Sequence, residues 1–257
     1  MKLPAQIVAR VYTLPKDRII AQFAFLMVVT RTFGLILVQG TVASIFQRMG
    51  DSQPFISAAS WWTVYGTVVD IICLLLLSVM MRGEGRTIFS LLDFDRSKII
   101  QDIKNGLIVF VLIFPLLGFL FPMGVMSVLF DADTHSAISG QLTDRSLPFW
   151  AYLYSLTIWW IIWSATEEIT YQGYCLPRLL RRFGQTRTLI LIGVFWALQH
   201  SFLPLIMDWR YMLWRFISFL PLVFAMIMAY VKLGRLAPII LAHALMDVAA
   251  SYGTFHH

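Results

Sequence analysis

The sequence has few charged residues and almost no cysteine. Asp, Glu, Lys and Arg make up 13% of its 257 residues, whereas hydrophobic residues make up 59%. A soluble domain usually carries about 25% charged residues, so the composition excludes an ordinary soluble fold and predicts an all-α membrane protein. The two cysteines, Cys73 and Cys175, match no CxxC or metal-binding spacing. The HExxH pattern of zinc proteases and an internal repeat are also absent.

Long apolar runs fill most of the chain instead. A transmembrane helix needs about 20 mostly apolar residues. By this criterion the sequence predicts about seven spans, and the protein is expected to be a multi-pass protein of the cell membrane. The spans are expected at residues 21–46, 60–81, 105–130, 148–173, 187–206, 211–231 and 236–253.

Lysine and arginine are distributed unevenly between the connecting segments. Alternate connections hold 15 of them on one side of the membrane and four on the other, while Arg31 lies inside the first span. Basic residues are enriched in cytoplasmic loops, so the N-terminus is predicted to be cytoplasmic and the C-terminus to lie outside. The net charge of +6 is therefore explained by the orientation of the protein in a membrane. For this reason we expect no nucleic-acid partner.

Several features between the polar motifs also carry structural expectations. Arg31 and Asp70 lie at similar depths in the first two spans, which favours an ion pair between helices. Residues 131–147 are rich in Asp, Ser, Thr and Gly and are typical of a flexible loop. Pro177 is expected to close the fourth helix. Residues 176–184 are typical of a basic amphipathic turn at the cytoplasmic surface, ended by Gly184.

Ionisable residues concentrate in the second half of the chain. Glu167 and Glu168 end an apolar run, and one acid at the centre of a membrane helix costs roughly 2.5 to 3.5 kcal/mol. His200 follows on the fifth expected span, and His243 with Asp247 on the seventh. The i,i+4 spacing of His243 and Asp247 places both on one helix face. From helix rise alone, the three stretches are expected to meet in the cytoplasmic half, with His200 placed deeper than the others.

This set of residues is suited to hydrolysis. A carboxylate beside a histidine can take a proton from water, and a second histidine or an amide can stabilise an oxyanion. Glu167, His200 and His243 are also candidate ligands for a divalent metal such as zinc, which would lower the pKa of bound water. A proton-coupled transporter and a purely structural polar network are the alternatives that the residues leave open.

Three motifs in order resemble those of the CPBP intramembrane proteases, which group CAAX prenyl endopeptidases with bacterial Abi-type and bacteriocin-related proteins. The family pattern is EExxxR, then FxxxH, then HxxxN or HxxxD. This sequence has Glu167-Glu168 with Gln172, then Trp196 with His200, then His243 with Asp247. The resemblance covers residues 148–253, which we take as a protease core, while residues 1–130 are taken as flanking helices.

The resemblance implies an intramembrane endopeptidase acting near the cytoplasmic face, with a membrane lipid environment and a CAAX-like or bacteriocin-like substrate, either a peptide or a lipidated protein. Glu167 would activate the hydrolytic water, with Glu168 as its acidic neighbour. His200 would share the water or a metal, and His243 and Asp247 would complete the site. The remaining motif residues are candidate substrate-binding residues: Tyr171, Gln172 and Trp196.

The sequence departs from the family pattern at two positions, and it has Asp rather than Asn in the third motif. Gln172 replaces the usual Arg, which removes a fixed cation. Trp196 replaces Phe, so an aromatic packing role survives. Asp247 would repel an oxyanion if ionised, so it must be protonated, paired with a histidine or bound to a metal. A catalytically inactive immunity or scaffold protein is therefore an alternative.

Overall fold

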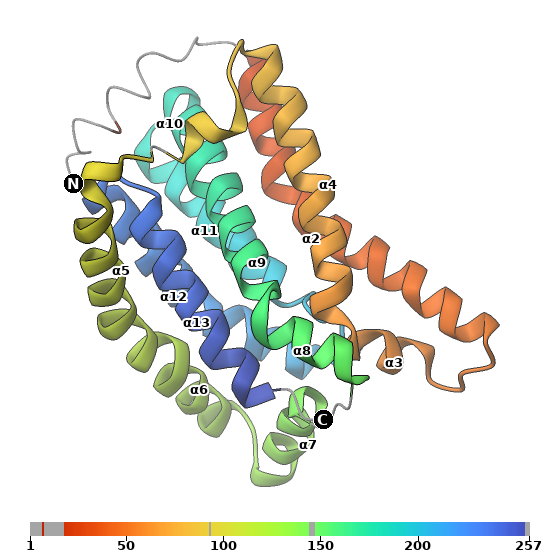
Figure 1. Cartoon of the computed structure of the whole chain (residues 1–257). Helices are drawn as coiled ribbons and strands as arrows, with labels where there is room; N and C mark the ends of the chain where they lie inside the picture. The colour runs from red at the N-terminus through yellow and green to blue at the C-terminus, as the bar shows by residue number, and fades with distance from the viewer. Residues whose placement is uncertain (1–6, 8–17, 93, 144–146, 255–257) are drawn as a thin grey trace.

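A bundle of long helices forms the protein, as seen in a computed structural model that describes residue 7 and residues 18–92, 94–143 and 147–254 (Figure 1). These residues contain no strand, in agreement with the predicted all-α class. Within the described ranges, four helical stretches are long and apolar enough to cross a membrane: Ile20–Arg48, Trp62–Gly83, Ile88–Leu129 and Trp209–Leu233. The protein is thus a membrane protein, while the number of spans and their orientation stay predictions.

The first half consists of a helical hairpin followed by a third long run. Helix α2 spans Arg18–Arg48, the short α3 spans Pro54–Ser60, and α4 spans Trp62–Gly83. Two 3₁₀ turns, η1 (Ile88–Leu91) and η2 (Arg96–Lys98), lie between α4 and the third run. This run consists of α5 (Ile99–Ile113), the π-helical η3 (Phe114–Leu120) and α6 (Phe121–Leu129).

Helix α7 corrects the expectation of a flexible loop, because residues Ala132–Thr143 are helical. The Oδ1 atom of Asp131 accepts a hydrogen bond from the backbone N–H of Thr134 at 2.8 Å. Aspartate is a favoured residue before a helix because its side chain can satisfy a free N–H group of the first turn. The sequence signal for α7 was therefore present, but the polar composition concealed it.

The second half supplies the centre of the bundle. Its fourth run consists of α8 (Phe149–Thr157), α9 (Trp159–Glu168), the π-helical η4 (Ile169–Cys175) and α10 (Leu176–Phe183). Helices α11 (Gln185–His200), α12 (Trp209–Leu233) and α13 (Ala237–Thr254) follow. In Figure 1, α9 lies between α4 and α13, and α5 covers the outer side of α13.

Pro177 does not end the fourth helical run, contrary to expectation. It lies in the first turn of α10, where proline is tolerated because an N–H group is not required there. The run ends where predicted, since Gly184 has a φ of 75° and follows the last residue of α10. A positive φ favours glycine because it lacks a Cβ atom.

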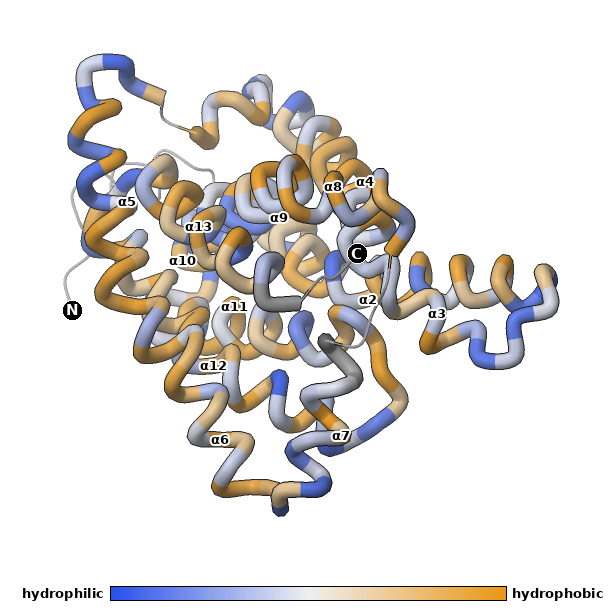
Figure 2. Tube along the Cα trace, turned by 60° about the horizontal axis from the view of Figure 1, so that its bottom comes forward, coloured by the Kyte–Doolittle hydropathy of each residue, from blue (hydrophilic) through white to orange (hydrophobic). Residues whose placement is uncertain are grey.

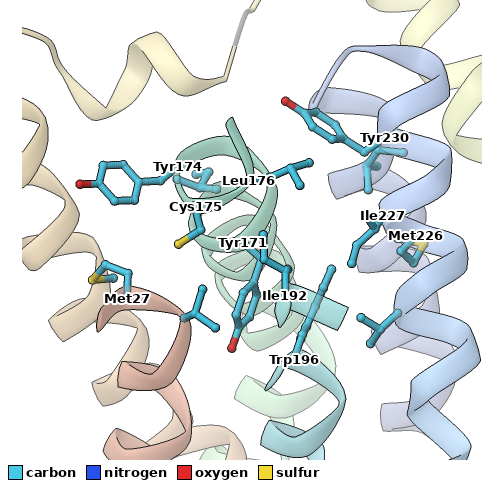
Figure 3. Packing of buried hydrophobic residues seen from close by; sticks show 14 of the residues in the cluster. Met27, Tyr171, Tyr174, Cys175, Leu176, Ile192, Trp196, Met226, Ile227 and Tyr230 are labelled. Carbon is cyan, nitrogen blue, oxygen red and sulfur yellow. The ribbon is translucent and has the colours of Figure 1, made fainter. Parts of the chain in front are cut away.

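The apolar packing does not separate the two predicted parts of the chain. Met27 from α2 and Trp163 from α9 belong to one continuous buried cluster, together with Ile227 from α12. Figure 3 shows part of this cluster, in which the rings of Tyr171 and Trp196 lie nearly parallel. Along the backbone, hydrophilic residues gather mainly in the connections, while apolar residues dominate the helices (Figure 2). The division at residues 1–130 and 148–253 stays a prediction.

Candidate active site

Glu167 and Glu168 are the last two residues of α9, directly before the π-helical segment η4. Both side chains are fully buried. A π-helical turn holds more residues than an α-helical turn and is frequent at functional sites. The acidic pair thus lies where the central helix changes its geometry, inside the bundle rather than at its surface.

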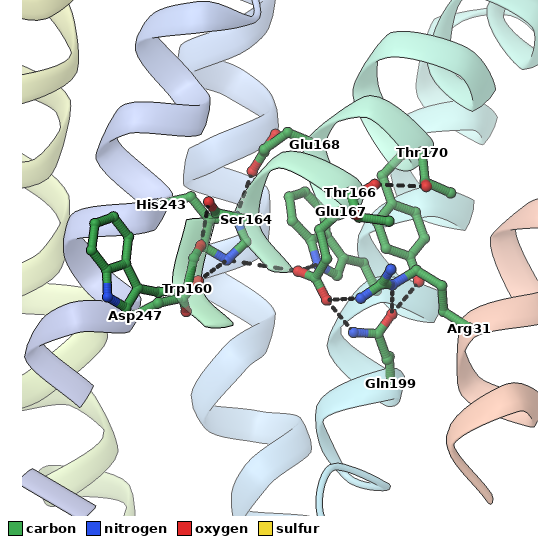
Figure 4. A network of polar contacts seen from close by, with 12 residues as sticks. Arg31, Trp160, Ser164, Thr166, Glu167, Glu168, Thr170, Gln199, His243 and Asp247 are labelled. Carbon is green, nitrogen blue, oxygen red and sulfur yellow. Dashed lines mark hydrogen bonds and ion pairs between the residues drawn. The ribbon is translucent and has the colours of Figure 1, made fainter. Parts of the chain in front are cut away.

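Glu167 accepts hydrogen bonds from three residues of two other helices, α2 and α11 (Figure 4). Its Oε1 atom accepts from Nε2 of Gln199, and Nη2 of Arg31 lies 3.4 Å from the same oxygen. Its Oε2 atom accepts from Nε1 of Trp196 at 2.7 Å. Hydrogen bonds from several donors stabilise an ionised carboxylate and fix its orientation. The Trp196 side chain therefore does more than the aromatic packing expected of it.

Glu168 points to the other side and pairs with His243. Its Oε1 atom lies 2.9 Å from Nδ1 of His243. On the opposite edge of the imidazole, Nε2 lies 3.7 Å from Oε2 of Glu167 and 3.7 Å from Oδ2 of Asp247. The structure thus brings Glu167, Glu168, His243 and Asp247 together around one ring, as the sequence predicted.

His200 lies near this cluster, but among the described residues it takes part in none of the hydrogen bonds and ion pairs that join Glu167, Glu168, His243 and Asp247. Its ring stacks on Phe219 with centroids 3.8 Å apart. Arg215 donates from Nε to the backbone oxygen of His200 at 3.2 Å, and its guanidinium lies over the Phe219 ring. Placed at the C-terminal end of α11, His200 is set apart from the acidic pair, and its greater depth in the membrane stays a prediction.

An apolar cavity of about 100 Å³ connects the two histidines. His200 and His243 contribute to its wall together with Asp247 and Trp196. The remaining wall comes from apolar residues of η3, α12 and α13, among them Phe114, Leu222 and Met246. The cavity is therefore polar at the two histidines and Asp247 and apolar elsewhere.

The candidate substrate-binding residues have different environments. The hydroxyl group of Tyr171 donates to Oε1 of Gln199 at 2.6 Å, and its ring stacks on Trp196. Gln172 is also fully buried, yet within the described part of the chain neither of its amide atoms has a hydrogen-bond partner. Buried polar groups are rarely left unpaired, so Gln172 is a position where a ligand or water is expected.

Sequence reasoning missed Gln199. This residue precedes His200 and is fully buried, and its amide links Glu167, Tyr171 and Arg31. The sequence carried one signal for it, because an amide inside an apolar helix needs polar partners. The predicted Arg31–Asp70 ion pair is confirmed, with Nη1 and Oδ1 2.6 Å apart.

The arrangement of Glu167, His200 and His243 bears on whether they can act as the predicted metal ligands. Among the described residues, no group of three or more His, Cys, Asp and Glu side chains is arranged so that it could hold a metal ion. The donor set as it lies therefore does not fit a metal, and the chemistry considered below needs none. A divalent metal stays an untested prediction.

Residues 148–249 match the model of the family described as type II CAAX prenyl endopeptidase Rce1-like. This confirms the resemblance to the CAAX protease group, and it covers all three motifs. It indicates a peptidase and agrees with the membrane character of the long helices. No curated protein and no solved structure matches the chain.

Proposed function

We propose that this protein is an intramembrane endopeptidase of the CAAX type, in which Glu167 and His243 activate a water molecule. The observation that carries the proposal is the buried cluster of Glu167, Glu168, His243 and Asp247 beside an apolar cavity. Three of these four side chains are acidic, and burying them without a chemical purpose is costly. The family match of residues 148–249 supports the same activity.

The position of the water follows from the distances around His243. The separations of 3.7 Å from its Nε2 to Glu167 and to Asp247 are too long for direct hydrogen bonds. A water between these three groups would bond to each of them. Within the described residues Oδ2 of Asp247 has no hydrogen-bond partner, so this atom favours an additional donor at that point.

The reaction proceeds by addition of this water to the scissile carbonyl. Glu167 takes a proton as the water oxygen forms its bond to the carbonyl carbon, and the carbonyl oxygen becomes an oxyanion. His200, in the wall of the same cavity, is the candidate donor to that oxyanion. The carbon–nitrogen bond then breaks, and the proton held by Glu167 passes to the leaving amine, directly or through His243.

Glu168 would serve this reaction by orienting His243. If the Nδ1–H group of His243 donates to Glu168, the Nε2 atom is left facing the water and Asp247. Such a hydrogen bond selects one tautomer of a histidine and fixes its ring. Because Glu168 acts on the far edge of the ring, its role differs from that of its neighbour Glu167, although the two are adjacent in sequence.

The substrate is proposed to be a membrane-associated peptide or protein that carries a lipid or apolar group near its C-terminus. The cavity beside His243 is small and mostly apolar, so it favours a small apolar side chain next to the cleaved bond over a polar one. A prenyl group on a CAAX-like C-terminus fits this description, and the matched family is named for such substrates. The distribution of Lys and Arg supports cleavage near the cytoplasmic face.

Cleavage of a fluorogenic lipidated peptide by the purified protein tests the proposal. Glu167→Gln keeps the shape of the side chain but removes the base, so turnover should fall by about 10² to 10⁴-fold. Glu84→Gln is the matched control, because Glu84 pairs with Arg178 away from the cavity and its variant should cleave normally. A folded Glu167→Gln protein that cleaves at the wild-type rate would show that the active site is assigned wrongly.

Proton transport is the second candidate, and one observation favours it. Asp70, Arg31, Glu167 and His243 follow one another through the bundle interior, and ionisable chains of this kind form proton relays in transporters. Proton flux into liposomes that is lost in Glu167→Gln, without any peptide cleavage, would support transport. Absence of both activities would favour the scaffold alternative. Metal analysis with chelator sensitivity of cleavage tests the predicted metal.

A further inference from the structure

Arg31 of α2 is a buried cation that faces two carboxylates from different helices. Its side chain and those of Asp70 and Glu167 are fully buried. Nη1 lies 2.6 Å from Oδ1 of Asp70 in α4, and Nη2 lies 3.4 Å from Oε1 of Glu167 in α9. Arg31 therefore belongs both to an ion pair between α2 and α4 and to the candidate active site.

The remaining contacts of Arg31 also lead to the site. Its Nε donates to Oε1 of Gln199 at 3.1 Å, and the guanidinium lies 4.4 Å from the centre of the Trp163 ring. Gln199 in turn donates to Glu167. The cation thus approaches Glu167 twice, directly and through this amide, as Figure 4 shows.

The rigid shape of the guanidinium makes these contacts interdependent. Its donors form a planar fork, so fixing one edge fixes the direction of the others. The shortest contact, with Asp70, sets the orientation of the group. As a result, Nη2 and Nε are directed towards Glu167 and Gln199. A lysine at position 31 would present a point charge without this directional control.

An ion pair that only joined α2 to α4 would not explain this arrangement. Buried ion pairs contribute little net stability compared with well-packed apolar residues, and leaving one charge unpaired is costly. A contact between α2 and α4 needs only the carboxylate of Asp70, whereas Arg31 also contacts Glu167 of the candidate site. Position 172, where the family pattern has Arg, carries an amide here, so the motif segment itself brings no cation to Glu167.

We propose that Arg31, oriented by Asp70, is a positioning residue for Glu167 and supplies from the first half of the chain the cation that the motif at residues 167–173 lacks. This inference rests on the proposed function, in which Glu167 is the base. It extends the site beyond the matched residues 148–249, because Arg31 and Asp70 both lie outside them. The first two spans are then part of the catalytic unit rather than a flanking scaffold.

The test is kinetic and uses the full-length protein in detergent or liposomes. In Arg31→Met/Asp70→Leu both charges of the pair are removed together, so neither is left buried alone. Displacing a catalytic group by about 1 Å costs roughly 100-fold in rate, so kcat should fall by about that factor. KM should stay within about twofold, because Arg31 touches Glu167 and not the substrate.

The pair of Arg235 and Asp102 offers a matched control. Nε and Nη2 of Arg235 donate to the two carboxylate oxygens of Asp102 at 2.7 and 2.5 Å, and the pair joins the α12–α13 connection to α5 away from the cavity. Arg235→Met/Asp102→Leu should change thermal stability little and leave kcat unchanged. If the Arg31 double variant loses no more kcat than this control, the positioning role is refuted.

A milder variant covers the case in which the double variant does not fold. Asp70→Asn keeps Arg31 next to Glu167 but removes the ionic partner that orients it, so kcat should fall by about tenfold with KM unchanged. Wild-type kcat in a folded Asp70→Asn protein would overturn the proposal. The proposed function fails separately, if Glu167→Gln remains active while Arg31 and Asp70 are intact.

Discussion

At the scale of single residues, Gln199 and Gln172 show how differently two buried amides can be used. Gln199 accepts hydrogen bonds from Tyr171 and Arg31 and donates one to Glu167, so both the oxygen and the nitrogen of its amide have partners within the protein. Gln172 is as deeply buried, but its amide has no partner within the described residues. The first amide therefore serves the folded state, and the second is available to a ligand.

Gln199→Leu should lower both stability and activity. The substitution leaves the Tyr171 hydroxyl group and part of Arg31 without an acceptor, and each unsatisfied buried group costs about 1–3 kcal/mol of unfolding free energy. Thermal unfolding in detergent, together with kcat for the lipidated peptide, measures the two effects. Tyr171→Phe is the comparison variant, since it removes one donor and should have the smaller effect. Equal stability of Gln199→Leu and wild type would contradict the hydrogen-bond network.

Gln172→Leu should weaken substrate binding without lowering stability. Because no protein partner is lost within the described residues, the melting temperature should be unchanged or higher. If the amide binds substrate, KM should rise by about tenfold or more, because a hydrogen bond across a buried site is worth about 1.4 kcal/mol. Steady-state kinetics beside a melting curve measures both. A large loss of stability would mean that Gln172 has a structural partner.

At the scale of helices, small residues decide how closely α5 and α13 approach each other. A Cβ atom at Gly106 would lie 2.9 Å from Cδ2 of Leu241 and 2.9 Å from the backbone oxygen of Pro238. The backbone oxygen cannot move aside as a flexible side chain could. Since α13 carries His243 and Asp247, this contact also helps to place the helix that carries two of the candidate site residues.

Gly106→Ala should destabilise the protein by about 1–3 kcal/mol, the usual cost of overpacking a close contact. The same substitution at Gly124 is the control, because a Cβ atom there meets no atom within 4 Å and the residue belongs to the same helical run. Unfolding of both variants in detergent, followed by circular dichroism, gives the comparison. Similar stability of the two variants would show that α5 and α13 are less tightly packed than the structure indicates.

At the scale of the whole molecule, the charge pattern predicts which end of the bundle faces the cytoplasm. The turns η1 and η2 lie at one end of the bundle and α7 at the other (Figure 1). The end with η1 and η2 includes Arg86, Arg96 and Lys98, whereas the end of α2 and its connection to α3 have one Arg, at position 48. By the positive-inside rule, the η1–η2 end is predicted to be cytoplasmic.

Cysteine labelling tests this orientation with little background, because Cys73 and Cys175 are both buried. Ser52→Cys and Arg86→Cys place a thiol on exposed residues at opposite ends of the α2–α4 hairpin. An impermeant thiol reagent added to intact cells should modify the first variant only, and inverted membrane vesicles should give the reverse result. The opposite labelling pattern would invert the topology and move the proposed cleavage to the other face.

The sequence by itself determined the helices, the membrane character and the order of the motifs. These features depend on local composition and on spacing along one helix, so apolar runs and the i,i+4 pair of His243 and Asp247 were sufficient. Local reasoning also had limits. It took α7 for a loop because the polar composition concealed the cap at Asp131. It ended the fourth helix at Pro177 because π-helical geometry depends on detailed backbone contacts.

Only the tertiary structure decided which distant side chains meet. Gln199 and Arg31 reach Glu167 from α11 and α2, and His200 faces the same cavity as His243 without contacting Glu167. Such contacts depend on the rotation of each helix about its axis and on the separation of helices in the bundle, and packing sets both of these. Whether residues 1–130 support the site or belong to it is therefore a question that spacing along the chain could not answer.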